Sequence, residues 1–264
     1  MDRRSFLASS GVAAAAAAGM TGTAVAAAPR TFLLVHGAWH GGWCWSRVAA
    51  NLRTRGHTVH TPTQTGLGER SHLLSKSITL DTFVEDIVNV AKWEDLNDVV
   101  LVGHSFGGSA ISGVADRMRG RVRQLIYLDA LMLENGRSPF SMLPKEVVEA
   151  RIKAADESSG GLSLPVPKAS AFGVVDAQQT AWVEAHLTPH PLGTYTSPLT
   201  LANPVGNGVP VTYIVCTDPI YAALQASRDW VKAAGWKTVE IKTGHDAMVT
   251  APDKLADMLD ALSV

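Results

Sequence analysis

The sequence is poor in several features that mark large classes of protein. It contains only two cysteines, Cys44 and Cys216, among 264 residues. We expect two buried free thiols, with a disulfide formed after export as the alternative. No group of cysteines and histidines has the spacing of a metal site, so the pattern predicts no metal.

An excess of charge of either sign is also missing. Lys and Arg number 23 and Asp and Glu number 24, and no basic stripe or acidic tail interrupts the balance. The composition therefore argues against a nucleic-acid partner and against a cationic one. Internal repeats are absent, and no phosphate-binding glycine motif points to a nucleotide cofactor.

The first 28 residues have the three regions of an export signal. Paired arginines, Arg3 and Arg4, precede the alanine-rich apolar stretch Gly11–Ala18, and Ala24–Ala26 offers a small-residue cleavage site. This order predicts a twin-arginine-type signal peptide over residues 1–28 and an exported protein, periplasmic or secreted. The apolar stretch is too short for a stable membrane span. A disordered or anchored N-terminus is the alternative.

Residues 29–264 suit one domain in which strand-like and helix-like segments alternate. This alternation predicts an α/β fold with a mostly parallel sheet and helices on both faces. The expected strands are Thr31–His36, His57–Thr61, Val99–Val102, Gln124–Leu128, Val211–Cys216 and Thr238–Ile241. The expected helices are Trp43–Arg55, Leu80–Leu96, Ser105–Arg119, Ala222–Ala234 and Ala251–Leu262.

Residues 131–203 break the alternation with seven prolines and two helical pieces, Pro144–Ala155 and Asp176–His186. Ligand sites of parallel sheets lie beyond the carboxyl ends of the strands, and long insertions in compact domains are usually functional or disordered. We therefore expect this insertion to form a cap over the site. A surface excursion without substrate contact is the alternative.

Gly103-His104-Ser105-Phe106-Gly107 stands between an expected strand and an expected helix. In that position a G-x-S-x-G sequence forms a tight turn that strains the serine backbone and exposes its hydroxyl. A glycine turn without chemistry, or with a bound phosphate, is the alternative. The context predicts Ser105 as a nucleophile.

A serine nucleophile needs a base and an acid that orients the base. His245 is the best base, because it follows the strand Thr238–Ile241 and precedes the last helix. We expect the acid to be Asp218, which follows Val211–Cys216 and lies between serine and histidine in chain order. Asp129, after the preceding strand, is the runner-up, and a helix-capping role for Asp218 is the other interpretation.

The remaining predictions concern the oxyanion hole and the pocket. Two backbone amides should stabilise the developing negative charge, and we assign them to Ala38 and Phe106. No Arg or Lys adjoins the motifs, which favours a neutral, apolar substrate. The expected pocket residues are Gly37, Trp39, Leu131, Trp182 and Met248.

Four segments together resemble the α/β-hydrolase superfamily, and within it the branch of plant hydroxynitrile lyases, plant methyl-ester esterases and related bacterial esterases. They are Leu33–Trp43, Gly103–Gly108, Tyr213–Asp218 and Gly244–Met248. Lyases of this branch carry a threonine and a lysine where this chain has Gly37 and Asp246. The resemblance therefore implies a serine carboxylesterase for small neutral apolar esters, without cofactor or metal. A cyanohydrin-cleaving lyase and a hydrolase-fold ligand receptor are the alternatives.

Overall fold

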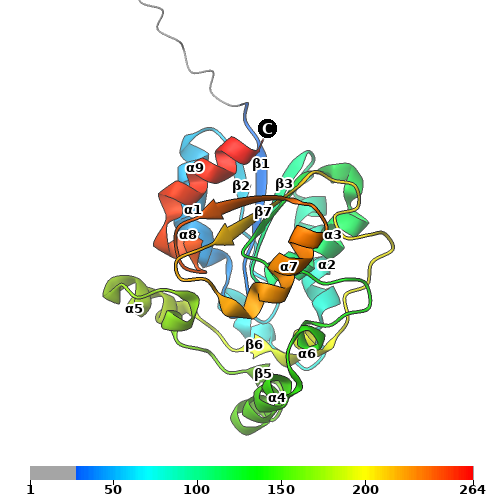
Figure 1. Cartoon of the computed structure of the whole chain (residues 1–264), viewed down its shortest axis with the longest axis vertical. Coiled ribbons are helices and arrows are strands. Elements are labelled where there is room, and N and C mark those ends of the chain that lie inside the picture. Colours follow the sequence, from blue (N-terminus) through cyan, green and yellow to red (C-terminus); the bar gives the residue numbers. More distant parts are fainter. Residues whose placement is uncertain (1–27, 264) are drawn as a thin grey trace, which may run out of the picture.

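The computed structural model describes residues 28–263, so the predicted signal lies outside the described part except for its last residue. The centre of the described fold is a six-stranded parallel sheet with the order β2-β1-β3-β4-β7-β8 (Figure 1). Its strands are β1 (Thr31–Val35), β2 (Thr58–His60), β3 (Val99–His104), β4 (Val122–Leu128), β7 (Val211–Cys216) and β8 (Lys237–Ile241).

Successive side chains of each strand belong to two different apolar clusters, because they point to opposite faces of the sheet. Phe32 and Leu34 of β1 belong to one cluster, whereas Leu33 and Val35 belong to the other. All four are at most 1% exposed. Burial on both faces explains the unbroken apolar runs of the sequence and confirms the predicted fold class.

Helices cover both faces of the sheet. In Figure 1, α1, α8 and α9 lie on one side of the strands, and α2, α3 and α7 lie on the other. These helices are α1 (Ser46–Thr54), α2 (Leu80–Trp93), α3 (Gly107–Arg117), α7 (Gln225–Ala233), α8 (Ala247–Thr250) and α9 (Pro252–Leu262). Short 3₁₀ turns are η1 (Gly42–Trp45), η2 (Gly68–Leu73), η3 (Arg119–Arg121) and η6 (Ala222–Leu224).

The element boundaries follow local chemistry. Helix α2 begins after Thr79, whose side chain accepts a hydrogen bond from the Thr82 amide, while the Thr82 hydroxyl accepts one from the Thr79 amide. This reciprocal cap satisfies two amides that the helix itself leaves free. The predicted strand Val211–Cys216 is reproduced residue for residue, and most other bounds shift by a few residues at their ends.

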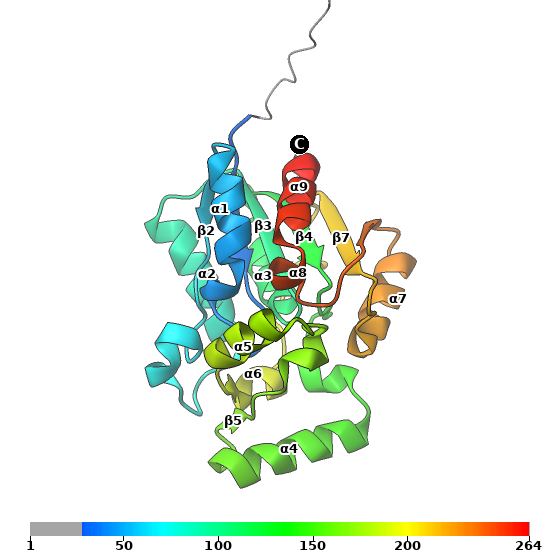
Figure 2. The same cartoon turned by 90° about the vertical axis from the view of Figure 1, so that its left-hand side faces the viewer.

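The insertion of residues 131–203 contains its own small elements. They are η4 (Pro139–Met142), α4 (Lys145–Ser159), β5 (Ser163–Leu164), η5 (Ala169–Phe172), α5 (Ala177–His186), β6 (His190–Pro191) and α6 (Leu192–Thr196). Strands β5 and β6 pair in antiparallel fashion. Figures 1 and 2 show α4, α5 and α6 grouped at one end of the sheet, away from the C-terminus.

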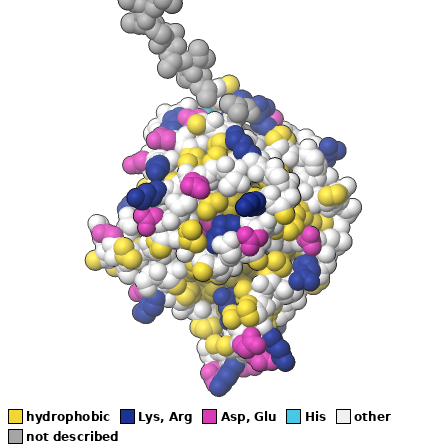
Figure 3. Space-filling model, in the orientation of Figure 1, with side chains coloured by type: hydrophobic (Ala, Val, Ile, Leu, Met, Phe, Trp, Pro, Cys, Tyr) yellow, Lys and Arg dark blue, Asp and Glu magenta, His cyan; other side chains and the backbone are white. Residues whose placement is uncertain are grey.

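That end of the sheet is where the parallel strands finish. The turns after β1, β3, β4, β7 and β8 therefore open toward the insertion, which is the usual position of a ligand site in such sheets. Charged side chains of both signs are interspersed on the face shown in Figure 3. Among residues 28–263, no helix has the length and apolar character needed to cross a bilayer.

Candidate active site

Ser105 sits in a sharp turn between β3 and α3. Its backbone φ is 53°, in the left-handed region that non-glycine residues seldom adopt. The Ser105 amide donates to the Leu128 carbonyl (3.1 Å), and the Ser105 carbonyl accepts from the amides of Gly108 (3.0 Å) and Leu131 (2.8 Å). A Cβ on Gly107 would lie 2.6 Å from the His36 carbonyl oxygen, so the turn requires glycine there.

His245 follows β8 and meets the serine as the sequence predicts. Its Nε2 lies 2.9 Å from Ser105 Oγ, and its Nδ1 lies 2.6 Å from Asp129 Oδ2. Because the Asp129 carboxylate accepts a hydrogen bond from Nδ1–H, the proton of the neutral ring is on Nδ1. Nε2 then has a lone pair that faces the serine hydroxyl. The geometry is that of a nucleophile, a general base and an orienting acid.

The acid at His245 is Asp129, so the prediction of Asp218 is wrong in its geometry. The Asp129 side chain is fully buried, and its other oxygen lies 3.5 Å from the Arg228 guanidinium. Asp218 instead has a side chain that is 62% exposed, and its nearest cation is Lys242 at 3.9 Å. Both aspartates follow strands that end at the same sheet edge, but only Asp129 turns toward the histidine.

The rings of Tyr221 and His104 lie close to the ring of His245. The Tyr221 ring stacks on it with centroids 4.1 Å apart, and the Tyr221 carbonyl accepts a hydrogen bond from Arg228 (3.1 Å). The His104 ring also lies close to His245, with centroids 4.6 Å apart, and its Nε2 donates to the His245 carbonyl (3.0 Å). Both the backbone and the ring of His245 are therefore fixed by neighbours.

The predicted oxyanion amides lie in turns that leave them free. Neither Ala38 N–H nor Phe106 N–H donates a hydrogen bond to another group within residues 28–263. Gly37 approaches the nucleophile so closely that a Cβ there would lie 2.8 Å from Ser105 Cβ. Two unpaired donors beside a nucleophile are the arrangement that a developing oxyanion requires.

The insertion holds the loop that contains Ala38. Trp39 has a φ of 64°, and its amide donates to His190 Nδ1 (3.2 Å). The Trp39 carbonyl accepts from the Thr188 amide (3.0 Å). His190 and Thr188 both belong to the insertion, so this segment fixes the backbone next to the candidate oxyanion hole.

Buried histidines surround the site and differ in protonation. Burial lowers the pKa of His36 to about 3, and it lowers the pKa of His104 and that of His190 well below the usual range. Burial acts in the same direction on His40, but the charge and hydrogen bond of Asp246 (3.0 Å) raise the His40 pKa overall.

These pKa shifts predict that acid weakens the fold. Between about pH 3 and 6.5 the unfolded chain binds protons on His36, His104 and His190 that the folded chain does not bind. Stability then rises with pH, by up to about 1.4 kcal/mol per pH unit for each such histidine. His40 acts oppositely, since its contribution is complete below pH 6.5 and is lost as pH rises through its raised pKa. Urea unfolding at pH 7, 6 and 5 should give a falling free energy of unfolding.

The same titration has a control within the chain. His72 is exposed, and His72→Gln should reproduce the wild-type slope. A free energy of unfolding that stays constant or increases between pH 7 and 5 would contradict the assignment of neutral buried histidines.

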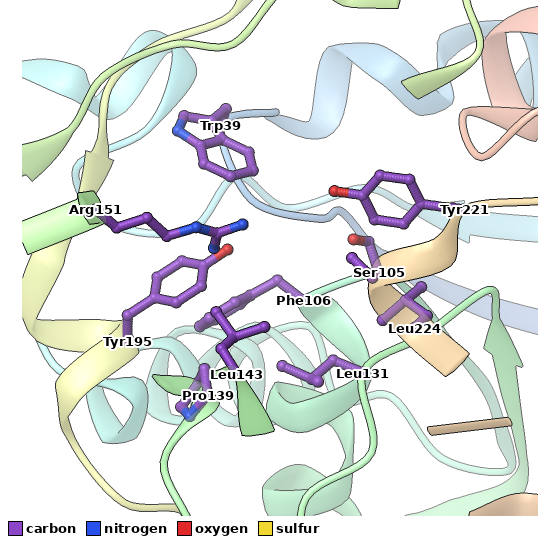
Figure 4. Close-up of a pocket in the computed structure, with 11 residues that line it drawn as sticks. Trp39, Ser105, Phe106, Leu131, Pro139, Leu143, Arg151, Tyr195, Tyr221 and Leu224 are labelled. Carbon is purple, nitrogen blue, oxygen red and sulfur yellow. The ribbon is translucent and has the colours of Figure 1, made fainter. Parts of the chain in front are cut away.

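A cavity opens beside Ser105 (Figure 4). It measures about 50 Å³ and adjoins a second cavity of about 340 Å³, with Trp39, Arg151 and Tyr221 lining both. The remaining residues around the first cavity are Ser105, Phe106, Leu131, Pro139, Leu143, Tyr195, Ala223 and Leu224.

Three of the expected pocket residues, Gly37, Trp182 and Met248, do not line these cavities. Trp39 and Leu131 do. Trp182 packs edge-on against Trp43, with centroids 5.0 Å apart, and lies outside the pocket. Met248 is fully buried in α8. Its position next to the catalytic motif in sequence did not bring its side chain to the cavity.

Sequence reasoning missed Arg151 and Tyr221. Arg151 lies on the same face of α4 as Val148, Ala154 and Ala155, which are the least exposed residues around it. An arginine at three- and four-residue spacing from small apolar residues was a usable signal. Tyr221 follows Asp218 by three residues in a loop, and no periodicity marks it.

Among residues 28–263, one group of side chains has the spacing of possible metal ligands. His104, His245 and Asp246 bring possible ligand atoms within 4.8 Å of one another. However, both nitrogens of His245 are occupied by Ser105 and Asp129, and Nε2 of His104 is occupied by a carbonyl. This cluster therefore does not fit a resident ion. Cys44 and Cys216 are free and buried, which confirms the expectation of two thiols.

Known proteins are similar to this chain in sequence and in fold. The sequence matches the alpha/beta hydrolase family over residues 32–258. It is 43% identical over 248 residues to a carbendazim hydrolyzing esterase of Nocardioides sp. (strain SG-4G), covering 88% of this chain and 98% of that protein. Methylesterase 10 of Arabidopsis thaliana is 27% identical over 257 residues, covering 88% and 91%.

A solved structure with the same fold is an extracellular alpha/beta-hydrolase from a Paenibacillus species. It superposes with a TM-score of 0.71 and 25% identity, covering 88% of this chain and 98% of that one. The family match spans the sheet, the elbow and the histidine turn, and the esterase relatives belong to the predicted branch. The chain therefore belongs to the alpha/beta hydrolase family.

Proposed function

We propose that the protein hydrolyses carboxylic esters through an acyl-enzyme on Ser105. The observation that carries the proposal is the continuous contact from Ser105 Oγ to His245 Nε2 (2.9 Å) and from His245 Nδ1 to Asp129 (2.6 Å). The apolar walls of the adjoining cavities favour an ester with an apolar body.

In the acylation step, His245 Nε2 takes the proton of the Ser105 hydroxyl while Oγ bonds to the ester carbonyl carbon. The carbonyl oxygen becomes an oxyanion, and the amides of Ala38 and Phe106 donate to it. The imidazolium gives its proton to the alkoxide oxygen as the carbon–oxygen bond breaks. The alcohol leaves, and the acyl group stays on Ser105.

Deacylation repeats these transfers with water. His245 accepts a proton from the water, whose oxygen attacks the acyl carbon, and then returns that proton to Ser105 Oγ as the acid departs. Asp129 stabilises the imidazolium in both steps without taking its proton. Arg228 neutralises the second oxygen of Asp129 in the buried site.

The Asp246 carboxylate does not take part in this scheme. It is fully buried behind His245 and binds His40, so it does not face the substrate cavity. The plant lyases resembled by this sequence have a lysine at this position, which would stabilise a departing cyanide. Asp246 supplies no such positive charge, which favours ester hydrolysis over carbon–carbon lysis.

A direct assay tests the proposed function. Protein comprising residues 29–264 is incubated with p-nitrophenyl esters of two to eight acyl carbons and with a fluorophosphonate. We expect turnover together with covalent phosphonate on Ser105, found by peptide mass spectrometry. Cyanide release from mandelonitrile without ester turnover would show the lyase instead. Tight retention of ester without turnover would show the ligand receptor.

The cellular location remains part of the proposal. The twin-arginine pattern of residues 1–28 supports export to the periplasm or beyond. One relative by structure is described as extracellular, which agrees with that interpretation for a protein of this fold. Fractionation of cells that express the whole chain would test it.

A further inference from the structure

We propose that Arg151 binds a carboxylate on the ester substrate, so that the preferred substrate is a half-ester of a dicarboxylic acid. This inference rests on the proposed function and specifies its substrate class. The sequence favoured a neutral substrate, because it showed no cation beside the catalytic motifs. The fold brings one there from α4, which is distant from those motifs in sequence.

The position of Arg151 on α4 is the first observation. The inward face of the helix is formed by Val148, Arg151, Ala154 and Ala155, while the residues between them are exposed. The Arg151 side chain is therefore only partly exposed to solvent. Figure 4 shows its guanidinium inside the pocket, between Trp39 and Tyr195.

Both lysines of α4 are paired with glutamates on its outer face. Lys145 lies 3.6 Å from Glu149, and Lys153 lies 3.8 Å from Glu157. The corresponding end of the molecule shows basic and acidic side chains together in Figure 3. Arg151 has no carboxylate within ion-pair distance among residues 28–263.

The walls around Arg151 contain no negative group. Arg151 is the one charged residue among those that line either cavity. Its guanidinium carbon lies 5.8 Å from the centroid of the Tyr195 ring, and Tyr221 is the other phenol nearby. Burial raises the pKa of both tyrosines, so they remain neutral hydroxyls that cannot neutralise the arginine.

The two cavities fix where the carboxylate would lie. Arg151, Trp39 and Tyr221 line both, so these three residues lie where the cavities meet, and Ser105 lines only the smaller one. The smaller cavity, about 50 Å³, suits a small alcohol group, and the larger, about 340 Å³, suits an acyl chain. A carboxylate at the end of that chain can form two parallel hydrogen bonds with a guanidinium.

Matched ester pairs test this assignment. Monomethyl adipate and monomethyl suberate are compared with methyl hexanoate and methyl octanoate, which have the same chain lengths but end in a methyl group. We expect kcat/KM of the wild type to be about tenfold higher for at least one charged ester than for its neutral partner, as befits a charge-assisted bond. Arg151→Met should lower that ratio by about tenfold, and Arg151→Lys should lower it less.

Lys153→Met is the matched control, because it removes a positive charge from the outer face of the same helix. It should leave the ratio of kcat/KM values unchanged. A wild-type ratio near one for both chain lengths, or the same ratio in Arg151→Met, would overturn the carboxylate site. An equal loss for charged and neutral esters would also overturn it, by showing a structural role.

A binding measurement separates this proposal from the proposed function. Calorimetry with Ser105→Ala compares the Kd of monomethyl suberate and methyl octanoate without turnover. Tighter binding of the charged ester that Arg151→Met abolishes in the same background supports the carboxylate site even where no ester is hydrolysed. Equal binding of the two esters overturns the site, whether or not Ser105 proves to be a nucleophile.

Discussion

Ser105→Ala is expected to lower kcat for ester hydrolysis by on the order of 10⁶-fold while the fold persists. The Oγ atom is the group that forms the acyl bond in the proposed mechanism, and it lies 2.9 Å from the base. What remains after its removal is transition-state binding by the two oxyanion amides and the cavity walls. Initial rates at saturating ester give kcat, and urea unfolding checks the stability of the variant.

Ser112→Ala provides the control for that loss. Ser112 is also buried, but its hydroxyl binds Tyr127 and the Gly108 carbonyl instead of His245. The variant should lose about 1 kcal/mol of stability and keep its kcat. If Ser105→Ala kept more than a tenth of wild-type kcat, another nucleophile would have to form the intermediate, and the proposed function would be wrong.

The elbow and the histidine could be predicted because local backbone geometry determines them. A serine between two glycines, directly after a buried strand, has few other conformations available. His245 follows the last strand, and parallel strands deliver the residues after them to one edge of the sheet. Neither prediction required knowledge of how distant segments pack.

The pocket could not be predicted in the same way, because the insertion forms much of it. Trp182 and Met248 were chosen for their sequence context, yet one packs against Trp43 and the other is buried in α8. Arg151 enters the pocket from a helix that no catalytic motif adjoins. Which face of that helix points inward follows from its tertiary contacts, and its sequence pattern alone indicates this only weakly.

The insertion also supports the backbone of the candidate site. The Thr188 amide donates to the Trp39 carbonyl (3.0 Å), and the Asp246 amide donates to the Phe172 carbonyl (3.1 Å). One bond holds the loop of the candidate oxyanion hole, and the other holds the residue next to the base. These contacts argue against a surface excursion that merely adjoins the domain.

The acid was misassigned because chain order does not distinguish two strands that end side by side. β4 and β7 are neighbours in the sheet; Asp129 follows β4 directly, and Asp218 follows β7 after one residue. The Asp129 backbone has a φ of 37°, and its amide donates to the Ile214 carbonyl (2.7 Å), which turns its side chain inward. Arg228, in α7, then provides a positive charge that the sequence around Asp129 does not reveal.

Asp129→Asn is therefore expected to lower kcat by about 10⁴-fold, whereas Asp218→Asn should change it by less than about twofold. An amide at position 129 can donate its N–H to His245 Nδ1 and so favour the tautomer with the proton on Nε2, facing Ser105. It also leaves the imidazolium of the reaction without a compensating charge. The Asp218 carboxylate touches neither ring nitrogen, and its weak contact with Lys242 is exposed.

Steady-state kinetics with one ester on both variants decides between the two acids, and urea unfolding shows whether either loss reflects a damaged fold. Asp129→Asn removes the partner of Arg228 from a buried site, so some loss of stability is expected alongside the loss of kcat. A folded Asp129→Asn protein with normal turnover would refute the assignment. A larger loss in Asp218→Asn would mean that the β7 loop rearranges to reach His245 during catalysis, because its aspartate lies at the surface in the free enzyme.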